Sequence, residues 1–222
     1  MNTLANNPST KESIVEKTIE LYLNLYESID FNDKYLQYSI AFVMFNPIFW
    51  NIIARLEYNT HFLTKFAGSP KKGCYILALI IFSIGLGRDH VFNMALKQQQ
   101  ISPFLNTDLF KKIGYFSIGL GQILVLSSMY QLGITGTYLG DYFGILMDDR
   151  VTSFPFNVSN NPMYQGSTLS FLGISLINAK PAGLLVTIMV QIMYGIALLF
   201  EEPFTAKIYA NRDKQNENKK IN

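Results

Sequence analysis

Residues 181–202, which read PAGLLVTIMVQIMYGIALLFEE, decide the fold of this chain. The first twenty of them contain no Asp, Glu, Lys or Arg, and the acidic pair Glu201 and Glu202 follows directly. About 20 apolar residues are enough for a helix to cross the hydrocarbon core of a bilayer. The run is apolar on all faces, whereas a barrel strand would alternate with a period of two. It therefore predicts a membrane-spanning helix that ends at the acidic pair.

Three more uncharged runs precede it, at residues 35–54, 73–87 and 113–140. The run at 73–87 reaches spanning length only if its helix continues past Arg88, whose apolar stem can snorkel to the interface. Because so many apolar runs leave little chain for a soluble core, we predict an all-α, multi-pass membrane helical bundle with three to four spans.

The first of these runs has Asn46 and Pro47 at its middle. Proline inside a helix removes a hydrogen bond and kinks the chain. The run is therefore either a kinked span or a re-entrant hairpin that leaves the membrane by the face it entered, and the hairpin is the favoured form.

The N-terminal part differs from the rest, and we divide the chain into a polar segment with an amphipathic helix, residues 1–34, and a membrane-embedded domain, residues 35–222. Apolar residues of the first segment recur on one helical face: Val15, Ile19, Tyr22, Tyr26 and Ile29. This helix either lies on the membrane surface or packs against the rest of the protein.

Composition excludes several classes of function. No basic run stands outside the C-terminal tail, so a nucleic-acid partner is not expected. The single cysteine, Cys74, excludes an intrachain disulfide and a metal site with several Cys ligands. His61 and His90 are far apart and lack the spacing of a zinc motif, so we expect no metal. The oligomeric state stays open.

Basic residues suggest an orientation in the membrane. They occur in residues 88–112, interpreted as a polar loop, and in the tail after residue 203, but are few in residues 141–180. Cytosolic loops carry an excess of Lys and Arg. This pattern predicts that the 88–112 loop and the C-terminus both face the cytosol.

Two forms are open for the connection at residues 141–180. It is either a lumenal loop, or a bent hairpin in which a short helix at 168–178 returns against the last apolar run. The hairpin would place Asn161 and Pro162 at the same face as Glu201.

Two short motifs have both a chemical and a purely structural interpretation. Glu201 and Glu202 follow a helix C-terminus, where the helix dipole disfavours carboxylates, so they either mark the end of the membrane or bind a cation. The sequence Gly119-Leu120-Gly121 either admits a ligand to the backbone or packs one helix on another. A second copy, Gly85-Leu86-Gly87, has the same two interpretations.

Longer strings in the C-terminal half resemble the phosphatidylethanolamine N-methyltransferase family of phospholipid methyltransferases. The close resemblance covers residues 115–209, and a looser one reaches back to about residue 35. The matching strings are residues 119–121, 136–146, 150–152, 154–157, 161–164, 166–168 and 194–209.

The resemblance implies an integral enzyme of the endoplasmic reticulum, or of membranes associated with mitochondria. It would transfer methyl groups from S-adenosyl-L-methionine to the amine of phosphatidylethanolamine and of its mono- and dimethyl derivatives, giving phosphatidylcholine. The phospholipid substrate would enter from the bilayer. The resemblance also implies a re-entrant first segment. The implied cofactor-binding residues are Gly119, Leu120, Gly121, Glu201 and Glu202.

The reaction needs a base for the amine proton, and Asp141, Glu201 and Tyr164 are the candidates for it. Tyr142, Phe143 and Tyr164 are candidates for cation–π contact with the methylated amine. Lys219 and Lys220 resemble a dilysine retrieval signal, which acts from the cytosol and agrees with an endoplasmic-reticulum location. The alternatives are a non-catalytic lipid-binding or scaffold protein and a membrane-embedded, nicotinamide-dependent reductase.

Overall fold

The computed structural model describes residues 8–221 of the chain, and side chains from Ile14 to Lys214. Within that part every regular element is a helix. Four helices are long and apolar enough to cross a membrane, namely α2, α4, α5 and α7, which confirms the all-α, multi-pass prediction. In chain order the elements are α1 (Pro8–Glu27), α2 (Lys34–Thr60), α3 (Phe62–Ala67), α4 (Pro70–Gln98), α5 (Asp108–Thr137), the 3₁₀ turn η1 (Gly140–Phe143), α6 (Pro162–Ile177) and α7 (Pro181–Ile221).

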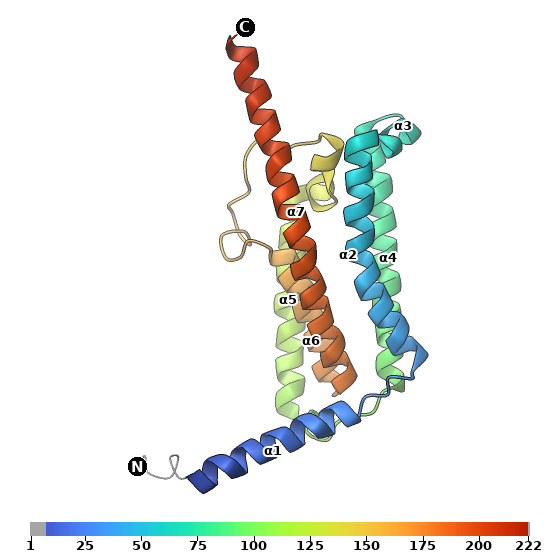
Figure 1. Ribbon diagram of the computed structural model, residues 1–222, viewed down its shortest axis with the longest axis vertical. Helices are drawn as coiled ribbons and strands as arrows, with labels where there is room; N and C mark the ends of the chain where they lie inside the picture. Colours follow the sequence, from blue (N-terminus) through green and yellow to red (C-terminus); the bar gives the residue numbers. More distant parts are fainter. Residues whose placement is uncertain (1–7, 222) are drawn as a thin grey trace.

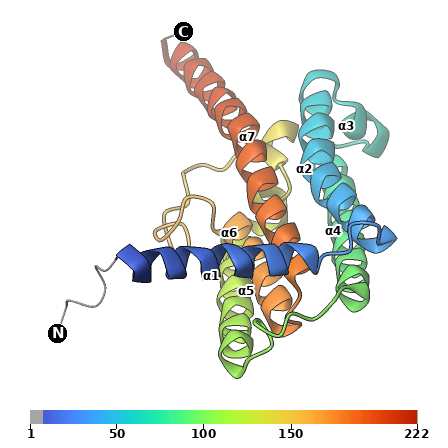
Figure 2. The same cartoon turned by 60° about the horizontal axis from the view of Figure 1, so that its bottom comes forward.

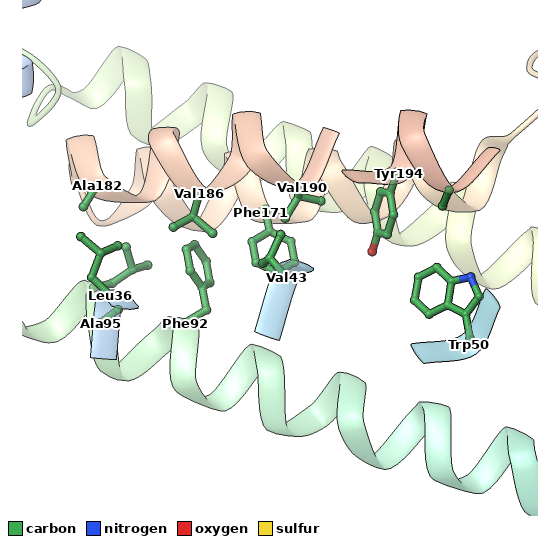
Figure 3. Close-up of a cluster of buried hydrophobic side chains, with 12 residues drawn as sticks. Leu36, Val43, Trp50, Phe92, Ala95, Phe171, Ala182, Val186, Val190 and Tyr194 are labelled. Atoms are coloured by element: carbon green, nitrogen blue, oxygen red, sulfur yellow. The ribbon is translucent and has the colours of Figure 1, made fainter. Parts of the chain in front are cut away.

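The helices form two groups, with α2 beside α4 and α5 beside α6, and α7 packs against both α2 and α6 (Figure 1). The hydrophobic core follows the inner face of α7 (Figure 3). Every fourth residue of that face points into the core, and Trp50 of α2 closes the row beside Tyr194. The labelled core residues are Leu36, Val43, Trp50, Phe92, Ala95, Phe171, Ala182, Val186, Val190 and Tyr194.

The prediction of a re-entrant first segment is wrong, because α2 is one continuous helix that contains Pro47. Asp33 caps its N-terminus by accepting a hydrogen bond from the Leu36 amide at 2.8 Å. A proline removes one backbone hydrogen bond, whereas a hairpin turn inside the hydrocarbon would leave several backbone groups without partners. A continuous helical crossing is therefore the less costly solution for this sequence.

The uncharged run at residues 73–87 is too short to span a membrane alone. Its helix, α4, continues past Arg88 to Gln98 and so reaches spanning length, as predicted. Two related predictions are wrong. The polar loop comprises only residues 99–107, because α5 begins at Asp108. The Arg88 side chain is only 13% exposed and donates to the Tyr194 hydroxyl at 2.9 Å, so it points into the bundle and does not snorkel.

The connection at residues 141–180 contains the bent hairpin, and the lumenal-loop alternative is wrong. Helix α6 returns along α5 and then reverses into α7 at residues 178–180. The N-terminus of α6 lies beside the acidic pair, since the Asn161 amide donates to Glu202 at 3.0 Å. Helix α6 itself begins at Pro162, six residues before the predicted start.

The short return of α6 along α5 overturns the prediction that the α4–α5 loop and the C-terminus lie at the same membrane face. The Ser102 amide donates to the Ala179 carbonyl at 2.9 Å, and Lys180 donates to the Gln99 carbonyl. The loop thus lies where α7 begins, at the opposite end of the bundle from the C-terminus (Figures 1 and 2). The loop and the C-terminus cannot both face the cytosol. Lys219 and Lys220 lie outside the described side chains.

The amphipathic helix is present as α1, which crosses the end of the bundle opposite to the C-terminus (Figure 2). Its apolar face is exposed, with Tyr22 at 69% and Tyr26 at 62%. Near its C-terminal end, Leu25 packs against the buried cluster of Leu105, Leu176 and Ala179. The rest of the described chain therefore leaves this face uncovered. A domain boundary at residue 34 and a position on the membrane surface stay predictions.

Buried Glu57 holds the turn from α2 to α3, and we expect its removal to destabilise that end of the bundle. Its carboxylate is fully buried and accepts bonds from the Leu63 amide, the Thr64 amide and the Thr64 hydroxyl. Glu57→Ala should lower the free energy of unfolding by about 3 kcal/mol, since it leaves buried donors without an acceptor. Thr64→Val removes one of the three donors and should cost about 1 kcal/mol. Thermal unfolding in detergent measures both, and equal losses would contradict this account.

Candidate active site

A cavity of about 860 Å³ lies between α4 and α5, with α6 and α7 contributing to its wall. Its lining includes the apolar residues Phe82, Leu86 and Leu126, which are 51%, 56% and 60% exposed. In a membrane these residues face lipid. The cavity is therefore open to the bilayer from the side, and its volume lies within the usual range for small-molecule sites, roughly 300–1,000 Å³.

The Glu201 carboxylate forms the polar centre of this cavity. It accepts hydrogen bonds from the Trp50 indole, from the Asn51 amide at 3.0 Å and from the Tyr164 hydroxyl at 2.7 Å. Three donors directed at one side chain match an acceptor-only, ionised carboxylate. They fix its position on α7 and leave a negative group on the cavity wall, which suits a cationic ligand.

Trp50 and Tyr164, which bond to this carboxylate, belong to a row of three aromatic rings that ends at Tyr194. The Trp50 and Tyr164 rings are stacked with centroids 6.3 Å apart, and the Tyr164 and Tyr194 rings with centroids 4.6 Å apart. All three residues line the cavity. Aromatic faces attract cations through the ring quadrupole, so the rings add to the attraction that Glu201 exerts on a positive group.

Asp141 is a second carboxylate on the cavity wall, and its Oδ2 accepts a hydrogen bond from Thr205 of α7 at 2.9 Å. Its neighbours Tyr142 and Phe143 are buried in a separate core cluster around Cys74 and Leu77. They do not line the cavity. Of the three aromatic residues proposed from the sequence for cation–π contact, only Tyr164 is therefore in place.

The two acidic residues of the pair occupy different environments. Glu202 is exposed, lies outside the cavity lining, and bonds to Asn161 at the start of α6. Successive helical residues point about 100° apart, so only one of two neighbours can face a given cavity. The structure thus separates a pair that the sequence presents as one motif.

The motif Gly119-Leu120-Gly121 does not line the cavity. Gly121 faces α6, and a Cβ added there would lie 2.5 Å from the Gly166 carbonyl oxygen. Gly119 and Leu120 are exposed on the outside of α5. This geometry supports the helix-packing interpretation, and cofactor binding by these residues stays a prediction. In the other copy, Gly85 and Leu86 do line the cavity.

Sequence reasoning missed four residues of the site: Trp50, Asn51, Arg88 and Tyr194. Arg88 had a usable signal, because a charge between apolar runs is expected to be functional if the helix continues through it. Trp50 is the only tryptophan in the chain, but nothing in its local pattern separates it from an interfacial anchor. Tyr194 lies in an apolar run and becomes distinct only beside Tyr164.

Comparison with known proteins identifies the family. The family model described as phospholipid methyltransferase matches residues 110–212. The phosphatidyl-N-methylethanolamine N-methyltransferase of Saccharomyces cerevisiae is 60% identical over 203 residues, which cover 91% of this chain and 98% of that protein. Phosphatidylethanolamine N-methyltransferase A of Dictyostelium discoideum is 49% identical over 93% of this chain and 99% of its own length.

The phosphatidylethanolamine N-methyltransferase of Rattus norvegicus is 48% identical over 174 residues, covering 78% of this chain and 87% of that protein. No solved structure matches the chain. Identity of this extent over nearly the whole length, together with a cavity that presents a carboxylate and aromatic rings to the bilayer, leads to one conclusion. The chain belongs to the phospholipid methyltransferase family.

Proposed function

We propose that this protein is an S-adenosyl-L-methionine-dependent enzyme that N-methylates phosphatidylethanolamine and its mono- and dimethyl derivatives to phosphatidylcholine. The observation that carries the proposal is the position of Glu201, held by three donors beside an aromatic wall in a cavity open to lipid. The names of the relatives favour this function over the scaffold and the reductase.

The cavity fits the proposed methyl donor, whose reacting centre is a positively charged sulfonium. A carboxylate and ring faces are the groups that attract such a cation. When bound, the donor supplies an electrophilic methyl group, and no metal is needed for the displacement. Holding donor and amine in line accounts for several kcal/mol of the barrier, since proximity effects reach about 7–11 kcal/mol.

In this proposal three side chains have separate roles. Glu201 holds the cationic centre. Its lone pairs already accept bonds from Trp50, Asn51 and Tyr164, so another group takes the amine proton. Asp141 accepts one side-chain bond, from Thr205, and so has acceptor capacity left for the amine proton. Tyr164 donates to Glu201 and positions that carboxylate.

The proposed location is the endoplasmic-reticulum membrane, with the C-terminal end of the bundle in the cytosol. Basic residues of three segments support this orientation, namely α3, the first turn of α4 and the C-terminal part of α7, which all lie at that end (Figure 1). They are Lys65, Lys71, Lys72, Lys207, Arg212 and Lys214.

Methyl transfer in membranes that contain only this protein tests the proposal. Labelled S-adenosyl-L-methionine is added, and the unmethylated, monomethylated and dimethylated ethanolamine lipids are offered in turn. We expect label in lipid with all three acceptors, and membranes from the same host without the protein give the background. The pattern across acceptors tells which steps the enzyme performs. No label with any acceptor, from correctly inserted protein, would refute the proposal.

A further inference from the structure

Arg88 is a charged residue inside the membrane-spanning part that the proposed methyl transfer does not use. It lies on α4 ten residues before the end of that helix, about 15 Å along the axis. Its side chain is 13% exposed and lines the cavity. Ionisable side chains within membrane spans are costly and usually mark a functional site, so this residue needs a role.

The contacts of Arg88 leave room for a ligand. Its guanidinium pairs with Asp89 at 2.8 Å, donates to the Tyr194 hydroxyl at 2.9 Å and lies 4.9 Å from the centre of the Phe171 ring. A guanidinium carries five N–H donors in a planar fork, so these contacts do not use all of them. Asp89 is half exposed, also lines the cavity and balances part of the guanidinium charge.

The guanidinium lies along the same wall as the Glu201 site. Tyr194 bonds to Arg88 through its hydroxyl, while its ring stacks on Tyr164, which in turn bonds to Glu201. Tyr194 and Glu201 are seven residues apart on α7, about 10 Å along the axis. One cavity therefore presents a cation-binding carboxylate and an anion-binding guanidinium, separated by two stacked rings.

We propose that Arg88 binds the phosphodiester of the phospholipid acceptor and so positions the amine at the Glu201 end of the cavity. An ethanolamine phospholipid carries an anion and an amine a few bonds apart, which matches the two ends of this wall. Arginine recognises phosphate oxygens through paired N–H donors. The inference rests on the proposed function, since it names the group by which the acceptor is held.

The carboxylate of the methyl donor is the other anion that a guanidinium could bind, and the surroundings favour the lipid. Gly85 and Leu86, three and two residues before Arg88 on α4, line the cavity, and Leu86 is also 56% exposed. Phe82, about one turn further from Arg88, also lines the cavity and is exposed. Acyl chains leaving a phosphate at Arg88 therefore meet apolar side chains and then the bilayer.

The test compares two acceptors in lipid nanodiscs. One is phosphatidyl-N-methylethanolamine, and the other is an analogue with the same amine and acyl chains in which an uncharged ether chain replaces the phosphodiester. We expect the wild-type protein to prefer the phosphodiester acceptor in kcat/KM by about 10- to 100-fold, the range for hydrogen bonds to a charged group. Arg88→Gln should abolish this preference, and Arg88→Lys should retain part of it.

The affinity for the methyl donor tells whether Arg88 binds the phosphodiester of the lipid or the carboxylate of the donor. The KM for S-adenosyl-L-methionine should be unchanged in Arg88→Lys and Arg88→Gln, and a rise in that KM with the acceptor preference intact would overturn the proposal in favour of the donor carboxylate. Lys97→Gln, which removes an exposed charge from the same helix, is the matched control and should keep the full preference.

The wild-type comparison stands even if Arg88→Gln does not fold. Equal use of both acceptors by the wild-type protein would overturn the inference while leaving methyl transfer itself intact. Absence of transfer to every acceptor would instead refute the proposed function.

Discussion

Glu201→Gln should lower kcat/KM for methyl transfer by about 100- to 1,000-fold, the loss that follows removal of one preorganised electrostatic group from an active site. The carboxylate is held by Trp50, Asn51 and Tyr164. The amide removes the negative charge and turns an N–H₂ group toward those donors. Labelled methyl transfer from purified protein in nanodiscs measures the loss. Donor affinity can be followed by the fluorescence of Trp50, the only tryptophan.

Glu202→Gln is the matched control, because it makes the same chemical change one residue further along. Glu202 is exposed and accepts one bond, from Asn161. An exposed polar pair contributes little, about 0.2–1 kcal/mol, so activity should fall less than about fivefold. Equal large losses in both variants, with thermal unfolding unchanged, would contradict the separate roles that the geometry gives them.

Gly121→Leu should lower the free energy of unfolding by about 3 kcal/mol, since overpacking a tight contact has a cost of this order. A Cβ at this position meets the Gly166 carbonyl oxygen at 2.5 Å and the Ser170 hydroxyl at 2.9 Å. Helices α5 and α6 must then move apart, and a shift of α6 displaces Tyr164, which it carries, from Glu201. Thermal unfolding in detergent and methyl transfer should therefore fall together.

Gly119→Leu separates helix packing from cofactor binding. No atom lies within 4 Å of a Cβ built on Gly119, and the residue is exposed on the outside of α5. We expect near-normal stability and activity from this variant. If Gly119→Leu unfolds normally but loses affinity for S-adenosyl-L-methionine, the family-derived assignment of this motif to the cofactor gains support. If Gly121→Leu loses donor affinity at full stability, the packing explanation is wrong.

The predictions that followed from local composition were reliable. Long uncharged runs have few alternatives to a helix in a bilayer, because backbone groups must find partners within the segment. This constraint gave a bundle of three to four spans, of which the structure has four, and the apolar periodicity gave α1. Glu201, Asp141 and Tyr164 line the cavity, and their catalytic roles stay predictions.

Errors arose where the path of the chain depended on contacts between distant segments. Pro47 and Arg88 both read as interruptions of a helix, and both lie inside continuous helices. The partner that keeps Arg88 inside the bundle is Tyr194, 106 residues away. The short helix α6 packs on α5 through glycine contacts. Because of this extra helix, the α4–α5 loop and the C-terminus lie at opposite ends of the bundle.

The sequence by itself determined an all-helical membrane enzyme of the phospholipid methyltransferase family and most of its acidic and aromatic candidates. Only the tertiary structure decided which of two neighbouring glutamates faces the cavity, and which of two Gly-Leu-Gly copies lines it. The physical reason is that hydrophobicity and helix periodicity are local properties, readable along the chain. The direction in which a side chain points relative to a distant helix is set by packing between segments, which no local pattern contains.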